Sequence, residues 1–270
     1  VVILLGFASI GISAAKLWLL LNATGPAVGF RRVLAAYYVG AFFNNFLPTS
    51  VGGDLVKAGS LAASGTDTQR VVSAIVVERV LGVVVLLLFT GLVAVLMPRL
   101  LANLGLARVR WALVAVVAVP LLALVASSLL WDSGVKGLLA TRSNSRIWGL
   151  LLKMGEGFYA YRSHPGTLLA GLGCSVVFYA IVTVSLFVAV HAVSPGISPI
   201  QAAGILHLTR LVELIPISVG SLGLKEGAVT YCVEALGIEA PRALAAALLL
   251  RICIWAHSAL GALVFMVRKG

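Results

Sequence analysis

The sequence predicts an all-α fold, a polytopic transmembrane helical bundle with two re-entrant or broken helix hairpins related as an inverted repeat. Composition is the first reason, since 61% of the 270 residues are hydrophobic and 11% are charged, against roughly 25% charged residues in average soluble domains. The second reason is that the apolar runs are long and continuous, which favours helices in lipid over alternating strands. The third is that two polar breaks inside apolar segments match each other in sequence.

Five apolar segments are long enough to span a bilayer, which takes about 20 residues of helix. They cover residues 1–21, 71–97, 111–131, 167–193 and 243–267, and the last is interrupted by Arg251 and His257. Residues 1–270 therefore form a single multi-pass transmembrane domain, which we expect in the inner (cytoplasmic) membrane. The three cysteines lack metal-ligand spacing, and the sequence shows no catalytic, cofactor-binding or nucleic-acid-binding motif. We accordingly expect no metal, no cofactor and no nucleic-acid partner.

Two further apolar stretches are each divided by a proline and glycines. PTSVGGDLVKAG begins at Pro48 and PISVGSLGLKEG begins at Pro216, and at this offset of 168 residues six of twelve positions are identical. Glycine and proline at membrane depth indicate broken or re-entrant helices that line a cavity. We predict repeat halves of about 29–97 and 197–267, with the two motifs facing each other across a central polar cavity.

Basic residues between the apolar runs test this topology. If both hairpins are re-entrant, ten basic loop residues fall on one side and four on the other, whereas two full crossings give seven and seven. The positive-inside rule prefers the re-entrant arrangement. The longest polar interval, 132–166, is then a basic, amphipathic cytoplasmic segment; a plain basic loop is the alternative.

Charged residues at membrane depth are costly and usually functional, so those near the breaks are candidate substrate-binding residues. The predicted set comprises Asn45, Pro48, Gly52, Gly53, Asp54, Lys57, Glu78, Arg79, Arg210, Glu213, Gly220, Lys225, Glu226 and Arg251. Free N–H groups at the start of a half-helix suit phosphate, and arginines add forked contacts. The alternative is that these charges only pair with one another, as Arg210 and Glu213 can at i,i+3.

Three stretches carry a family resemblance. FFNNFLPTSVGGDLVKAG, VVERVLGVVVLLL and LIPISVGSLGLKEGA, followed by a helix with Arg251, resemble the lysylphosphatidylglycerol synthase transmembrane-region family over about residues 29–267. The resemblance implies a membrane module that moves aminoacylated lipid between leaflets, without the synthase domain of multidomain members. It also implies one more helix before residue 1, so we expect the sequence to begin part-way into a longer protein.

The predicted function is therefore that of a flippase-like lipid translocase acting on a phospholipid, aminoacylated or not. A first alternative is a membrane subunit that binds a lipid or polyprenyl acceptor for a separate transferase or synthase. A second alternative is a structural membrane partner without a substrate. The expected partners are phospholipid and the membrane, with a separate synthase or transferase and a homo-oligomer as further candidates.

Overall fold

The computed structural model describes residues 1–47, 52–106, 161–214 and 219–269, with five further residues between 108 and 118. Four of its helices are long and apolar enough to cross a membrane. They are α1 (Val2–Ala23), α4 (Thr68–Leu96), α9 (Pro165–Val193) and α12 (Ala240–Lys269). The prediction of an all-helical multi-pass protein is confirmed. Most of the predicted span at 111–131 and most of the basic segment 132–166 lie outside the described residues.

Four shorter helices accompany the long ones. They are α2 (Phe30–Asn44) and α10 (Pro199–Glu213), with 15 residues each, and α3 (Gly52–Ala62) and α11 (Leu224–Glu234), with 11 each. At 1.5 Å per residue these helices measure about 22 Å and about 16 Å, less than the roughly 30 Å of a bilayer core. The short helix α5 (Pro98–Asn103) and the 3₁₀ turn η2 (Val219–Ser221) complete the described elements.

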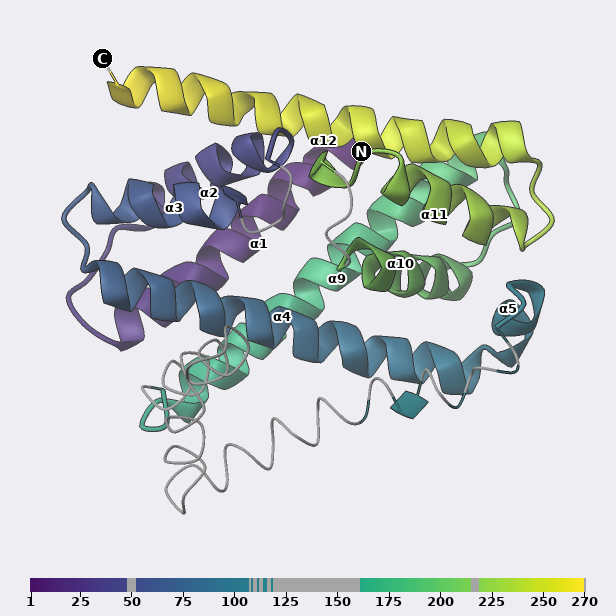
Figure 1. The fold of residues 1–270 in the computed structure, drawn as a ribbon, viewed down its shortest axis with the longest axis horizontal. Helices are drawn as coiled ribbons and strands as arrows, with labels where there is room; N and C mark the ends of the chain where they lie inside the picture. Colours follow the sequence, from purple (N-terminus) through teal and green to yellow (C-terminus); the bar gives the residue numbers. More distant parts are fainter. Residues whose placement is uncertain are drawn as a thin grey trace, which may run out of the picture.

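The order of helix lengths repeats along the chain. A long helix, a 15-residue helix, an 11-residue helix and a second long helix occur as α1–α4 and again as α9–α12. In Figure 1, α1 and α9 run through the centre in opposite directions, and the flanking helices α4 and α12 also run in opposite directions. This order of helix lengths begins one helix before each of the predicted repeat halves, 29–97 and 197–267. The opposite insertion of the two halves in a bilayer stays a prediction.

Local sequence signals set several helix ends. Ser198 and Gln201 form a capping box at the start of α10, where each side chain accepts a hydrogen bond from the other residue's backbone N–H. Asp67 caps α4 by accepting from the Arg70 backbone N–H at 2.7 Å. The Arg70 guanidinium donates to the carbonyl oxygens of Leu21 and Pro26, which joins the end of α1 to the start of α4.

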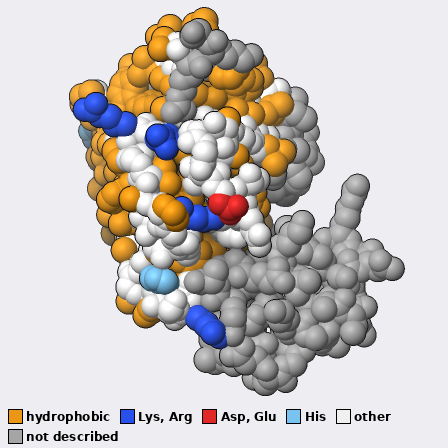
Figure 2. Space-filling view, turned by 90° about the vertical axis from the view of Figure 1, so that its left-hand side faces the viewer, with side chains coloured by type: hydrophobic (Ala, Val, Ile, Leu, Met, Phe, Trp, Pro, Cys, Tyr) orange, Lys and Arg blue, Asp and Glu red, His pale blue; other side chains and the backbone are white. Residues whose placement is uncertain are grey.

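The apolar packing divides into two clusters of buried side chains. One surrounds α1, α2 and the first half of α4, and the other joins α9, α10, α11 and α12 to the second half of α4. Many large hydrophobic side chains outside these clusters are exposed, as expected for helices that face lipid. Figure 2 shows one end of the molecule, where hydrophobic side chains surround a paler area that carries a few Lys and Arg side chains. Each half therefore has its own apolar core, and α4 contributes to both.

Close contact between α2 and α3 requires a glycine at position 53. A Cβ there would overlap the carbonyl oxygen of Gly40 and the side-chain oxygen of Asn44. We expect Gly53→Ala to lower the free energy of unfolding by about 1–3 kcal/mol, as overpacking does, measured by thermal unfolding in detergent. The control is Gly59→Ala on the same helix, where a Cβ meets no atom within 4 Å. We expect it to be neutral or mildly stabilising, and equal losses in both variants would refute the packing argument.

Candidate functional site

Residues at the edges of the two helix breaks are in contact with each other. The backbone N–H of Gly220, in the second break, donates to the carbonyl oxygen of Leu47, in the first, over 3.4 Å. Gly220 has φ +56°, and a Cβ there would lie 2.8 Å from the carbonyl oxygen of Asn45. This contact therefore needs a glycine for both its conformation and its space. The predicted site residue Pro48 lies outside the described residues.

A cavity of about 330 Å³, lined by both charged and apolar side chains, lies beside this contact. Among its lining residues are Asn44 and Asn45 from α2 and the turn after it, Arg210 and Glu213 from α10, Lys225 from α11 and Arg251 from α12. Gly220 and Ser221 of the second break also line it. Residues predicted from both halves therefore share one cavity. We call Arg210, Glu213, Lys225, Arg251 and the adjoining Glu226 the central site.

Arg210 and Lys225 share a single carboxylate. Arg210 Nη1 lies 2.8 Å from Glu213 Oε2, and Lys225 Nζ lies 3.9 Å from Glu213 Oε1. Arg210 Nε and Glu213 Oε1 are buried, and neither has a hydrogen-bond partner among the described residues. An unsatisfied buried donor is costly, so the Arg210 guanidinium has capacity for a further acceptor.

Each of the three guanidinium nitrogens of Arg251 donates a hydrogen bond to the protein itself. Its Nε donates to Glu226, its Nη1 to the carbonyl oxygen of Gly220 at 3.0 Å and its Nη2 to that of Ser221 at 2.9 Å. Glu226 also accepts from the backbone N–H of Gly223 at 2.9 Å. The pair Arg251–Glu226 thus fixes the backbone of the second break, and Arg251 supports the cavity wall more than it offers free donors to the cavity.

The first break is held by asparagine side chains. Asn45 Nδ2 donates to Ser258 Oγ on α12 at 2.8 Å, and Asn44 Oδ1 accepts from the backbone N–H of Gly53 at 2.9 Å. Asn44 is absent from the predicted set although its neighbour Asn45 is included. The position of Asn44 directly before the break is the sequence feature that could have identified it as a site residue.

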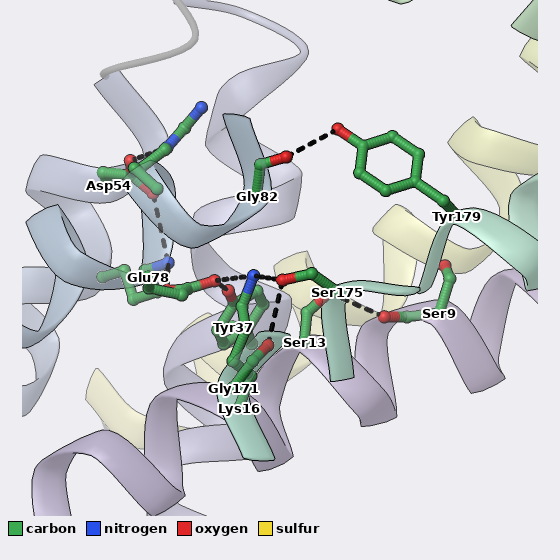
Figure 3. Close-up of polar contacts among 12 residues, drawn as sticks. Ser9, Ser13, Lys16, Tyr37, Asp54, Glu78, Gly82, Gly171, Ser175 and Tyr179 are labelled. Carbon is green, nitrogen blue, oxygen red and sulfur yellow. Dashed lines mark hydrogen bonds and ion pairs between the residues drawn. The ribbon is translucent and has the colours of Figure 1, made fainter. Parts of the chain in front are cut away.

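A second group of polar side chains, which we call the Glu78 cluster and which is largely buried apart from the half-exposed Arg79, is drawn in Figure 3. It comprises Lys16, Tyr37, Asp54, Lys57, Glu78, Arg79 and Ser175, from α1, α2, α3, α4 and α9. Lys57 Nζ lies 3.2 Å from Glu78 and 3.1 Å from Asp54, and it also sits over the Tyr37 ring. Tyr37 donates to Glu78, so both carboxylates of the cluster are bound by several partners.

The remaining contacts of the Glu78 cluster reach α1 and α9. Lys16 Nζ donates to Ser175 Oγ at 3.1 Å and lies 3.9 Å from Glu78 Oε1. On the other side, Arg79 Nε lies 2.5 Å from Asp54 Oδ2. Lys16, Tyr37 and Ser175 are absent from the predicted set. The sequence signal for this group was Lys16, a lysine inside the predicted apolar span 1–21.

The cations of the predicted substrate-binding set are divided between these two places. Lys225 and Arg251 line the cavity, whereas Lys57 and Arg79 belong to the Glu78 cluster and are not among the described cavity-lining residues. The chemistry available in the cavity is therefore binding of an anion by Arg210 and Lys225, with amides of the first break nearby. Among the described residues, no group of three or more His, Cys, Asp or Glu side chains is placed to hold a metal.

Comparison with known proteins gives one result that covers almost the whole chain. No curated protein and no solved structure matches the chain. The family model described as lysylphosphatidylglycerol synthase TM region matches residues 1–261. This confirms the family predicted from the sequence motifs, and the chain belongs to the lysylphosphatidylglycerol synthase transmembrane-region family.

Proposed function

We propose that the protein is a lipid translocase of the inner membrane, which receives the phosphate of a phospholipid in the central cavity and moves the lipid between leaflets. The observation that carries this proposal is the charge of the central site, whose three described cations, Arg210, Lys225 and Arg251, exceed the two carboxylates, Glu213 and the adjoining Glu226, by one. Family membership supports a role connected with membrane lipids. A phosphodiester suits such a cavity because its oxygens accept charge-assisted hydrogen bonds.

Arg210 and Lys225 are the side chains that hold the phosphate in this proposal. Arg210 Nε is a buried donor with no hydrogen-bond partner among the described residues. Within the same part of the chain, Lys225 Nζ lies 3.9 Å from Glu213 Oε1, beyond hydrogen-bonding distance. Arg251 keeps the second break in place through Gly220 and Ser221. An inverted arrangement of the two halves would let their short helices open the cavity to each leaflet in turn.

Leaflet-resolved transport in reconstituted vesicles tests the proposal. We expect the protein to equilibrate fluorescent phosphatidylglycerol between leaflets faster than protein-free vesicles do. Lys225→Gln should slow this by about tenfold or more, because a hydrogen bond to a charged group contributes about 1.5–3 kcal/mol. The matched control is Arg242→Gln, which removes a cation whose side chain is 59% exposed at the start of α12.

Each outcome of the transport assay has a defined meaning. Slower transport in Lys225→Gln with normal transport in Arg242→Gln supports the proposal. Equal rates in vesicles with and without the protein would refute translocation. If phosphatidylglycerol were bound but not moved, the cavity would serve a subunit that presents a lipid acceptor to a separate transferase or synthase.

A further inference from the structure

An apolar groove of about 620 Å³ lies next to the central cavity. Its walls come from α10, α11 and the turn that follows α5, with Leu208, Leu211, Leu224 and Leu104 among the lining side chains. This volume lies within the roughly 300–1,000 Å³ typical of ligand pockets. The groove is thus large enough for a ligand of its own, and its lining is suited to hydrocarbon.

Hydrogen bonds hold the walls of this groove in place. Tyr231 Oη on α11 donates to the carbonyl oxygen of Leu104 at 3.2 Å, and Asn103 Nδ2 donates to that of Ala235 at 2.9 Å. These bonds attach the end of α5 to the second half of α11 and to its C-cap residue, Ala235. Gly227 on α11 also lines the groove, and a Cβ built on it would meet no atom within 4 Å. The groove is therefore a fixed hollow with open space above a glycine.

The groove and the cavity share a boundary. Thr209 lines both, and its hydroxyl donates to the carbonyl oxygen of Leu206 in its own helix, so it presents no unpaired polar group to the groove. On α11, Leu224 lines the groove and the next residue, Lys225, lines the cavity. The cationic and apolar compartments therefore share Thr209 as a lining residue, and they lie against neighbouring faces of the first turn of α11.

We infer that the groove holds one hydrocarbon chain of the same anionic phospholipid whose phosphate occupies the central cavity. This inference rests on the proposed function. An anionic head joined to a long apolar chain matches the two adjoining compartments in charge and in polarity. Burial of a chain contributes about 0.8 kcal/mol per CH₂ group, so the groove would add to the affinity given by the phosphate. The substrate class is then a lipid recognised by its phosphate and by one of its chains together.

Filling the groove provides the test. Gly227→Phe places a side chain in the open space, and the matched control is Gly59→Phe, because Gly59 aligns with Gly227 in the repeat motif and its Cβ also meets no atom within 4 Å. The probe is phosphatidylglycerol with a photoreactive diazirine at the end of an acyl chain, carried in phosphatidylcholine nanodiscs. Mass spectrometry of the cross-linked peptides then measures labelling of α11 and of residues 98–106.

We expect the unaltered protein to be labelled in the groove by this probe. Gly227→Phe should lower that labelling about tenfold, which corresponds to losing the contacts of two or so CH₂ groups. Gly59→Phe should leave it unchanged. Lys225→Gln should lower it as well, because in this proposal the head and the chain belong to one molecule. Thermal unfolding of each variant confirms that it is folded.

Several results would overturn the inference. Equal labelling by a phosphatidylcholine probe would show that the groove takes bulk lipid without regard to the head group. If Gly227→Phe left the labelling unchanged while Lys225→Gln still slowed transport, the groove would not be the binding site of the chain, and the proposed function would be unaffected. Labelling that is unchanged in Lys225→Gln would show that the chain in the groove and the phosphate in the cavity do not belong to the same lipid molecule. Failure of phosphatidylglycerol both to label and to be transported would overturn both proposals.

Discussion

Arg251→Gln is expected to lower the free energy of unfolding by roughly 3–5 kcal/mol, the usual cost of breaking a buried ion pair by removing one partner. The side chains of Arg251 and Glu226 are only 5% and 10% exposed, so the carboxylate left behind is stranded away from water. The carbonyl oxygens of Gly220 and Ser221 lose their donors as well. Thermal unfolding in detergent and the yield of folded protein measure the effect.

Two further variants make this prediction specific. Arg242→Gln removes an arginine from the same helix, but its pair with Glu239 is exposed at 3.7 Å, so we expect a change within about 0.5 kcal/mol. The double variant Arg251→Gln/Glu226→Gln should recover part of the loss, because no buried charge is stranded. A fully stable and active Arg251→Gln protein would show that Arg251 neither holds the second break nor takes part in the site.

Glu78→Gln is expected to destabilise the protein by a similar amount, again roughly 3–5 kcal/mol. Glu78 accepts from Tyr37, lies 3.2 Å from Lys57 Nζ and is the anionic neighbour of Lys16. Neutralising it leaves Asp54 as the remaining carboxylate of the cluster, against three cations. Two lysines that are almost completely buried would then be poorly compensated.

The same unfolding measurement checks this second prediction. Glu239→Gln is the control, because that carboxylate is 75% exposed and should contribute little. Adding Lys16→Met to Glu78→Gln should restore part of the stability, since it removes one of the stranded cations. An unchanged unfolding temperature in Glu78→Gln would mean that the Glu78 cluster is not maintained as a charged network.

The helices themselves could be predicted because hydrophobicity alone defines them. The segment predicted at 71–97 corresponds to α4 (Thr68–Leu96), and the predicted breaks separate α2 from α3 and α10 from α11. Proline and glycine marked these breaks, because neither continues a helix at low cost. Helix ends shifted by a few residues where a cap, such as Asp67 before α4, decides the boundary.

The register of the repeat was harder to obtain from sequence identity. Aligning the two motifs by identical residues pairs Lys57 with Lys225. In the structure, however, Lys57 lies in the second turn of α3 and Lys225 in the first turn of α11. A better guide is the acid–arginine pair, since Asp54 pairs with Arg79 and Glu226 with Arg251, each across 25 residues. Most of the identical residues of the two motifs lie in or next to the breaks. An added turn such as η2 in one break shifts where the following helix begins, although the sequence motif stays the same.

Pairing between distant helices could not be predicted from the chain order. Lys16 on α1 reaches Ser175 on α9, 159 residues away, and Glu78 on α4. These contacts depend on how the long helices rotate and slide against one another, which is decided by packing over their whole length. The sequence therefore identified most of the buried charges near the breaks but not which of them share a partner.

The charge of the central site has an electrical consequence. Its three cationic and two anionic side chains leave one excess positive charge. In the proposed translocation, a bound phosphodiester with one negative charge would neutralise that excess, so the loaded protein would change conformation without work against the membrane potential. The empty site would carry its charge through the field, at about 2.3 kcal/mol per elementary charge for each 100 mV crossed. Voltage would therefore act on the return of the empty protein and not on the passage of the lipid.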